Sequence, residues 1–337
     1  MSVGNGGEAP VAARSGAGSR AGRFLSPLSR ALRDNLSMIV IFLLLMLWLG
    51  LYVPNFFSWV NMRGLALAVS MVGMVACTML FCLASGDFDL SVESIVAFAG
   101  VLAAVVINAT SNVPLGILAG IAAGGAVGLV NGFVIAKLRI NALITTLATM
   151  QIVRGLAFIV SKGQAVGISN EGFFALGLGS FLNVPNPVWI TLGCFVVFGV
   201  LLTWTTFGRN TLAIGGNREA ARLSGVPVER IKIVIFAAQG LMAGFAGVVL
   251  ASRITSGQPN TSSGFALDVI SACVLGGVSL SGGGGTIQGV IIGVLIMGTV
   301  QNAMNLLNVA TFYQYVARGL ILLAAVLFDQ FRRRRTA

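Results

Sequence analysis

The sequence predicts an all-α polytopic membrane protein with about ten transmembrane helices, because it is too apolar to be soluble. Of its 337 residues, 56% are hydrophobic and only 9% are charged, and the mean hydropathy is +0.94. Soluble domains carry roughly 25% charged residues. Glycine, with 44 residues, is also more frequent in membrane helices than in soluble ones. The composition therefore indicates a multi-pass inner-membrane protein.

Apolar runs long enough to cross a bilayer recur along the chain, and each crossing needs about 20 apolar residues. The predicted spans lie near residues 36–53, 64–84, 91–108, 114–136, 142–160, 187–207, 231–252, 265–280, 286–306 and 312–329. The eighth run is short and broken by glycine, so ten is an approximate number. The first run follows a basic segment like the start of a signal peptide, but it is long enough to span and no small-residue cleavage site follows.

The basic residues predict the orientation of these spans. Of the 21 Lys and Arg residues, 16 fall in segments that ten spans place on one side: the N-terminal tail, 137–139, 208–232 and 332–335. Cytoplasmic segments carry such an excess, so both termini are expected in the cytoplasm. This explains the net charge of +11, and no basic and aromatic pattern indicates nucleic acid. The expected parts are a disordered tail (1–35), a transmembrane domain (36–330) and a basic tail (331–337).

The sequence lacks the residues that a zinc site or a nucleotide-binding P-loop requires. The chain has no His, and its four Cys residues lie in apolar runs without a C-x-x-C pair, so a zinc site is not expected. The stretch 281–286, SGGGGT, is rich in glycine but lacks Lys, whereas a P-loop needs G-x-x-x-x-G-K-[ST]. We therefore expect no metal or cofactor bound by this chain.

Residues 208–232, GRNTLAIGGNREAARLSGVPVERIK, form a polar segment between two apolar runs and hold seven of the 31 charged residues. Asn217 can cap a short helix, and Gly225 suits the left-handed residue that ends one. Pro227 prevents its continuation. Because so short a helix is marginal alone, it must be held by its own membrane helices or by a partner's groove. A docking helix is therefore favoured over a solvated loop.

Two polar breaks suggest a weak internal repeat in two halves. The segments LASGDFDLSV (83–92) and CVLGGVSLSG (273–282) align Gly86 with Gly276. Interrupted helices at corresponding positions of two halves point to the translocation path of a transporter. Chance similarity in a sequence rich in Gly and Leu is the alternative.

Three acids, Asp87, Asp89 and Glu93, cluster where the chain enters its third span. An acid inside the membrane is a functional candidate because burying its charge is costly, so a proton or cation relay is one interpretation. The other is structural: Asp89 can cap the helix that begins at Leu90, and Asp87 can lie in solvent or pair with a basic neighbour. The structural interpretation is favoured.

Other polar residues fall inside predicted spans. Arg154 could line a path, pair with an acid such as Asp268 or Glu171, or reach the membrane surface. These three roles for Arg154 stay open.

Three amides, Gln301, Asn302 and Asn305, lie on one face of the ninth span. Amides suit sugar hydroxyls because they donate and accept hydrogen bonds, and they equally suit contacts between helices. On a different span, Gly120, Gly124 and Gly128 are spaced four apart, which predicts a close helix contact.

The polar segment and one of the breaks resemble a known family. IGGNREAARLSGVPVERIK (214–232) looks like the coupling loop of bacterial sugar ABC importer permeases of the ribose, xylose and arabinose class. LASGDFDLSV looks like their Ser-Gly-Gly-x-Asp-Leu-Ser-Val signature. The family has Gly at the position of Asp87 and usually a small residue at that of Glu93, so neither acid is expected to have a family-wide role.

The resemblance extends over residues 38–330 and is closest to the arabinose-transporting members of that class. The segments that carry it are INALITTLATMQIVRGLAF (140–158), TTFGRNTLAIGGN (205–217), ASRITSGQP (251–259) and NAMNLLN (302–308).

The resemblance implies a membrane subunit without chemistry of its own. Two copies form the pore, an ATPase that holds ATP and Mg²⁺ docks on the cytoplasmic loop 208–230, and a periplasmic binding protein delivers the sugar. Closure of the ATPase would move the docked helix as a rigid body. The residues implied in ATPase coupling are Gly215, Gly216, Asn217, Glu219, Ala220, Ala221, Leu223, Ser224 and Gly225. The residues proposed above for a translocation path are Asp87, Asp89, Arg154, Gln301, Asn302 and Asn305.

Two other classes of function are alternatives. An ion-coupled secondary sugar transporter would place its energetics in Asp87, Asp89 or Arg154, but it leaves the polar segment unexplained. An enzyme within the membrane lacks His, metal-ligand spacing and a pair of acids at one depth. Uptake that needs an ATPase distinguishes the permease from the secondary transporter.

Overall fold

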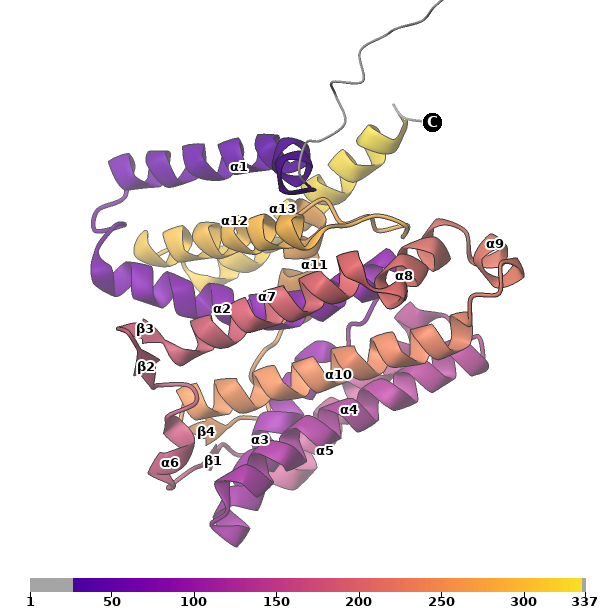
Figure 1. The fold of residues 1–337 in the computed structure, drawn as a ribbon. Helices are drawn as coiled ribbons and strands as arrows, with labels where there is room; N and C mark the ends of the chain where they lie inside the picture. Colours follow the sequence, from indigo (N-terminus) through magenta and orange to yellow (C-terminus); the bar gives the residue numbers. More distant parts are fainter. Residues whose placement is uncertain (1–26, 335–337) are drawn as a thin grey trace, which may run out of the picture.

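The computed structural model describes residues 27–334, which fold almost entirely into helices (Figure 1). The helices are α1 (Pro27–Tyr52), α2 (Trp59–Ala84), α3 (Val92–Thr110), α4 (Val113–Lys137), α5 (Ala142–Ser161), α6 (Glu171–Phe174), α7 (Asn186–Trp204), α8 (Thr206–Gly216), α9 (Arg218–Leu223), α10 (Val228–Arg253), α11 (Phe265–Leu275), α12 (Ile287–Leu306) and α13 (Thr311–Arg334). Four two-residue strands complete the fold: β1 (Val166–Gly167), β2 (Ser180–Phe181), β3 (Val184–Pro185) and β4 (Ser256–Gly257).

The long helices confirm a polytopic membrane protein. Within residues 27–334, seven helices, α2, α3, α4, α5, α7, α10 and α12, have the length and composition of membrane spans. Three shorter apolar stretches occupy the other predicted spans, at Leu36–Tyr52, Phe265–Leu275 and Thr311–Leu327. α1 begins at Pro27 rather than near Leu36, and most of the predicted N-terminal tail lies outside the described residues.

α2 forms the centre of the bundle. Its residues from Ser70 to Ala84 are buried throughout, and it packs against α7, α10, α11 and α12. Three of the four cysteines, Cys77, Cys82 and Cys273, are buried in the same core. They act there as small apolar side chains.

α4 and α10 cross at glycines, as the spacing on α4 predicts. A Cβ on Gly124 would overlap the carbonyl oxygen of Gly240, and one on Gly128 would overlap that of Phe236. A Cβ on Gly240 would in turn overlap the carbonyl oxygen of Gly124. Only glycine lets the two backbones approach this closely, so the predicted close contact is confirmed.

The two ends of the bundle differ in structure. In Figure 1, α8, α9 and the end of α13 lie towards the right, whereas α6 and the four strands lie at the left. At the left end β1 pairs with β4, and β2 pairs with β3, both antiparallel. Ser252, near the end of α10, bonds the segment around α6. Its Oγ donates to Phe173 O and accepts from Gly177 N–H.

Candidate functional site: a capped docking segment against two helix breaks

The polar segment folds as two helices rather than one. α8 was not predicted, because the sixth span was expected to run to residue 207 and a helix was expected only after Asn217. Thr205 has an extended backbone, with φ −106° and ψ 160°, and its side chain accepts from Gly208 N–H at 3.3 Å. This cap separates α8 from α7, since a capping residue leaves the helical conformation.

α9 is capped at both ends as predicted. Asn217 Oδ1 accepts from Ala220 N–H at 2.9 Å. At the other end Gly225 has φ +83°, and Val226 N–H donates to Ala221 O at 3.1 Å. This is the glycine-ended motif that satisfies the last carbonyls of a helix. A six-residue helix is thus held by its own two caps.

The two sides of α9 face different surroundings. Ala221 is buried in the main core, whereas Leu223 is 79% exposed. Glu219 and Arg222 are also exposed and form an ion pair of 3.0 Å. Exposed pairs of this kind add little stability. One side of α9 is thus fixed to the bundle, and the other presents an apolar side chain among charged ones.

The turn between α4 and α5 contributes to the same surface. Arg139, with φ +57°, lines a cavity of about 250 Å³ together with Arg218, Glu219, Arg222 and Glu229. The surface around α9 therefore carries basic side chains from two separate parts of the chain.

The end of α8 meets both helix breaks at a junction of glycines. A Cβ on Gly215 would overlap Ala84 O and Gly283 N. One on Gly282 would lie 2.8 Å from the Cα of Gly215 and 3.0 Å from Gly86 N. Gly283 N–H donates to Ala84 O at 2.9 Å. The segment that leads to α9 therefore touches the end of α2 and the loop between α11 and α12 directly.

The two breaks end their helices in the same way. After α2, Gly86 has φ +82° and Asp87 N–H donates to Cys82 O. After α11, Gly277 has φ +78° and Val278 N–H donates to Cys273 O. The matching glycine is thus Gly277, and the predicted match of Gly86 with Gly276 is wrong by one residue, because Gly276 has an ordinary negative φ of −68°.

Asp89 is fully buried and joins a polar network across three helices. Its Oδ1 accepts from Ser91 N–H at 2.9 Å and from Ser91 Oγ–H at 2.6 Å. Asn131 on α4 donates to Ser91 Oγ at 2.9 Å, and Thr149 on α5 donates to Asn131 Oδ1 at 2.7 Å. Asp89 thus holds the chain at the start of α3. α3 begins at Val92 with Ser91 as its N-cap, so the predicted cap by Asp89 of a helix starting at Leu90 is wrong. The bonds of Asp89 to Ser91 instead form a local turn that precedes the helix.

Asp87 does not lie in solvent but forms a buried ion pair with Lys232 on α10. The distance from Lys232 Nζ to Asp87 Oδ2 is 2.6 Å, and the two side chains are 5% and 11% exposed. Of the two structural roles considered for Asp87, the structure has the pairing with a basic neighbour.

Arg154 pairs with neither of the acids considered for it. Its Nη2 lies 3.6 Å from Glu93 Oε1, and its Nη1 donates at 2.8 Å to the carbonyl oxygens of Pro259 and Thr261. Glu93 Oε2 also accepts from Gly264 N–H at 2.9 Å. The two charges thus hold the loop between α10 and α11 against α3 and α5.

Asp268, one of the two acids considered for Arg154, pairs with a different arginine. Its Oδ2 lies 3.3 Å from Arg318 Nη1, a contact between α11 and α13.

Two of the three amides of α12 bond to neighbouring helices. Asn302 and Asn61 on α2 exchange two amide hydrogen bonds of 2.7 and 3.0 Å. Asn305 Oδ1 accepts from Gln314 Nε2 at 3.0 Å, which joins α12 to α13. The third amide, Gln301, has its Nε2 buried without a hydrogen-bond partner among the described residues. Asn302 and Asn305 therefore serve contacts between helices.

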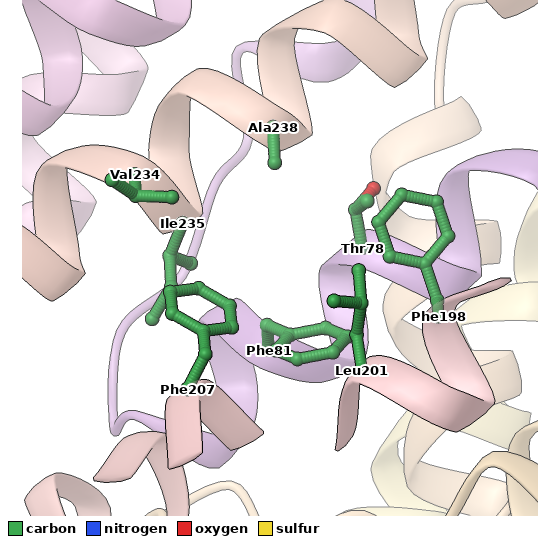
Figure 2. A pocket seen from close by; sticks show the side chains of 8 residues that line it. All are labelled: Thr78, Phe81, Phe198, Leu201, Phe207, Val234, Ile235 and Ala238. Carbon is green, nitrogen blue, oxygen red and sulfur yellow. The ribbon is translucent and has the colours of Figure 1, made fainter. Parts of the chain in front are cut away.

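An apolar cavity of about 200 Å³ lies beside the start of α8. Figure 2 shows Phe81, Phe198 and Phe207 around it, with α10 on the opposite side. The rings of Phe81 and Phe207 stack with centroids 5.7 Å apart, and those of Phe81 and Phe198 meet edge to face at 6.1 Å. One wall of the cavity, Phe207, is thus part of the segment that leads to α9.

A bundle of apolar spans with one polar, capped segment at its end is the architecture of a multi-pass membrane protein. Within the described residues no group of three or more His, Cys, Asp and Glu side chains could hold a metal ion. The chain belongs to the family described as the permease component of branched-chain amino acid transport systems, whose model matches residues 61–326. Like its relatives, it is a transport subunit and not an enzyme.

Curated relatives cover most of this chain. The L-arabinose transport system permease protein AraH of Escherichia coli (strain K12) is 64% identical over 301 residues, which are 89% of this chain and 92% of the relative. The L-arabinose ABC transporter permease protein AraH of Azospirillum brasilense is 62% identical, over 88% of this chain and 87% of its own length. The ribose import permease protein RbsC of Bacillus subtilis (strain 168) is 42% identical, over 82% and 87%. No solved structure matches. The resemblance to sugar ABC permeases is confirmed.

Proposed function

We propose that the chain is the membrane-spanning permease subunit of an ATP-driven importer that carries a pentose, L-arabinose, across the bacterial inner membrane. The observation that carries this proposal is the 64% identity to an L-arabinose permease over 89% of the chain. The ribose permease is less similar, at 42%. Arabinose is therefore favoured over ribose as the transported sugar.

The partners of such a permease follow from the proposal. An ABC ATPase, which holds ATP and Mg²⁺, docks on the surface around α9, and a periplasmic binding protein delivers the sugar to the opposite end. A second copy of this chain completes the pore, and lipid surrounds the bundle. The exposed Leu223 and the buried Ala221 of α9 support the docking, because one face of the helix is fixed to its own bundle while the other is free.

The proposed topology has ten crossings with both termini in the cytoplasm. Exposed basic side chains gather at the α9 end of the bundle, including Lys137, Arg139 and Arg209. Cytoplasmic loops carry such an excess. Exposed aromatic residues such as Tyr52 and Tyr313 mark the other end, as expected where helices leave the membrane.

The path residues need a separate test. Asn302 and Asn305 bond other helices, which supports contacts between helices over sugar binding. Asp87 and Arg154 face opposite charges, which weakens the ion-coupled alternative. We still propose that these four side chains shape the translocation path of the sugar.

The substrate is tested by uptake of labelled L-arabinose in a transport-null cell that expresses this chain with its ATPase and binding protein. Unlabelled L-arabinose, xylose, ribose and galactose serve as competitors. The proposal expects the strongest competition from L-arabinose. Stronger competition by another sugar removes the arabinose assignment and leaves the permease assignment intact.

A further inference from the structure

We propose that the buried Asp87–Lys232 ion pair is a positioning element for transport: it couples movement of the docking segment to the break between α2 and α3. The inference rests on the proposed function, because it assumes that an ATPase moves α9. It assigns to two residues the task of passing that movement to the membrane part of the chain.

Lys232 lies where a movement of α9 enters the membrane part of the chain. α10 begins at Val228, just after the turn that ends α9, and Lys232 is in its second turn. Asp87 lies in the short link from α2 to α3, beside the fully buried Asp89. The pair therefore joins the first turns of α10 to the non-helical link between α2 and α3.

The pair is short and shielded from water. At 2.6 Å between Lys232 Nζ and Asp87 Oδ2, with side chains 5% and 11% exposed, it is a close ion pair in a low-dielectric setting. Removing one partner leaves a buried charge without compensation. The bundle therefore resists any displacement of α10 relative to residue 87, so the two move together.

The other end of the docking segment meets the same break. Gly215, at the end of α8, packs on Ala84, and Gly283 donates to Ala84 O. The segment from α8 to α10 is thus attached on both sides of α9 to residues that flank the break at 85–91. The contact of Gly215 with Ala84 is backbone against backbone, so it resists only a closer approach of α8 to the end of α2. The ion pair also resists separation of α10 from the link that holds Asp87.

Packing near the start of α8 is incomplete, which makes the polar attachment more important. Phe207 of α8 and Ala238 of α10 line the apolar cavity of about 200 Å³, so the packing between the two helices is incomplete there (Figure 2). Apolar contacts across a gap are weaker than in a close-packed core. Movement is therefore transmitted to the break through Lys232 and the glycine junction rather than through a continuous apolar wall.

The test uses the whole transporter, with ATPase and binding protein, reconstituted in vesicles. L-Arabinose uptake and ATP hydrolysis are measured in the same vesicles for Asp87→Asn, for the neutral double variant Asp87→Asn/Lys232→Met, and for the exchanged pair Asp87→Lys/Lys232→Asp. The neutral double variant matters most, because removing both charges also removes the penalty of an unpaired buried charge.

We expect the neutral double variant to insert and assemble like the wild type but to move about tenfold less sugar per ATP, a loss equivalent to about 1.4 kcal/mol of coupling. The exchanged pair should recover much of that ratio. A neutral double variant with the wild-type ratio would overturn the inference, because the pair would then serve stability alone. If Asp87→Asn fails to insert, the two double variants still decide.

The control is Asp268→Asn with Arg318→Met, which removes a partly buried pair between α11 and α13. It should lower stability without changing the ratio of sugar to ATP. A wild-type chain that shows no ATP-dependent uptake would instead refute the proposed function, so the two failures are distinguishable.

Discussion

Gly215, next to the last residue of α8, packs so closely on the carbonyl oxygen of Ala84, the last residue of α2, that no side chain fits between them. We predict that Gly215→Ala displaces α8 and lowers sugar uptake, because overpacking costs on the order of 1–3 kcal/mol. The measurement is uptake at equal amounts of inserted protein.

The matched control for Gly215 is Gly193→Ala on α7, where an added Cβ meets no atom within 4 Å. Its uptake should equal that of the wild type. Equal uptake by Gly215→Ala would show that the junction of α8 with α2 does not limit transport.

Gly225 is expected to be needed for its backbone and not for space. An added Cβ there meets nothing within 4 Å, but φ is +83°. A β-branched residue in this conformation costs about 1–2 kcal/mol, so Gly225→Val should loosen the end of α9 and leave ATP hydrolysis uncoupled from uptake, with normal insertion.

Gly225→Asn separates backbone strain from other effects, because Asn tolerates the left-handed conformation. This variant should transport close to the wild-type rate. Equal losses in the Val and Asn variants would contradict the explanation by backbone strain.

Asn302 is predicted to stabilise the α2–α12 contact. Asn302→Ala leaves the amide of Asn61 without its partner, which costs about 1–3 kcal/mol. The thermal unfolding midpoint of the purified protein should fall, whereas the KM for sugar uptake should stay the same.

The double variant Asn61→Leu/Asn302→Leu tests this assignment further. Because both partners are replaced, we expect it to be more stable than Asn302→Ala. A large rise in KM in both variants, with unchanged unfolding midpoints, would instead support the role of Asn302 in the sugar path.

The crossing of α4 and α10 should not tolerate a larger residue. Gly124→Val places a side chain onto the carbonyl oxygen of Gly240, so the two helices must separate and the amount of folded protein should fall sharply. Gly155→Val on α5 is the control, because an added Cβ there meets nothing within 4 Å. Similar amounts of folded protein in both variants would contradict the close packing.

Local features of the site were predictable from the sequence because they depend on neighbouring residues. The caps of α9 need only Asn217 and Gly225, which lie within one turn of the helix ends. α8 was missed because residues 208–216 were assigned to the polar segment, in which a helix was expected only after Asn217. The cap at Thr205 is the signal that could have found it.

Contacts between distant segments were not predictable. Asp87 was expected in solvent or beside a basic neighbour, but nothing in the sequence selects Lys232 on a helix far along the chain. The partner of Arg154 was sought at Asp268 or Glu171, whereas the packing of α3 against α5 places Glu93 there. Such pairs follow from the three-dimensional packing of the spans and leave no local pattern.

The central claim is that an ATPase docked at α9 drives the conformational change by which this chain transports sugar. The most direct test compares uptake of labelled L-arabinose by vesicles that hold this chain with a live ATPase and with a catalytically inactive one, in the absence of any ion gradient. We expect uptake only in vesicles that hold this chain together with the live ATPase. Uptake that survives with the inactive ATPase and collapses only when an ion gradient is removed would contradict it and favour ion coupling.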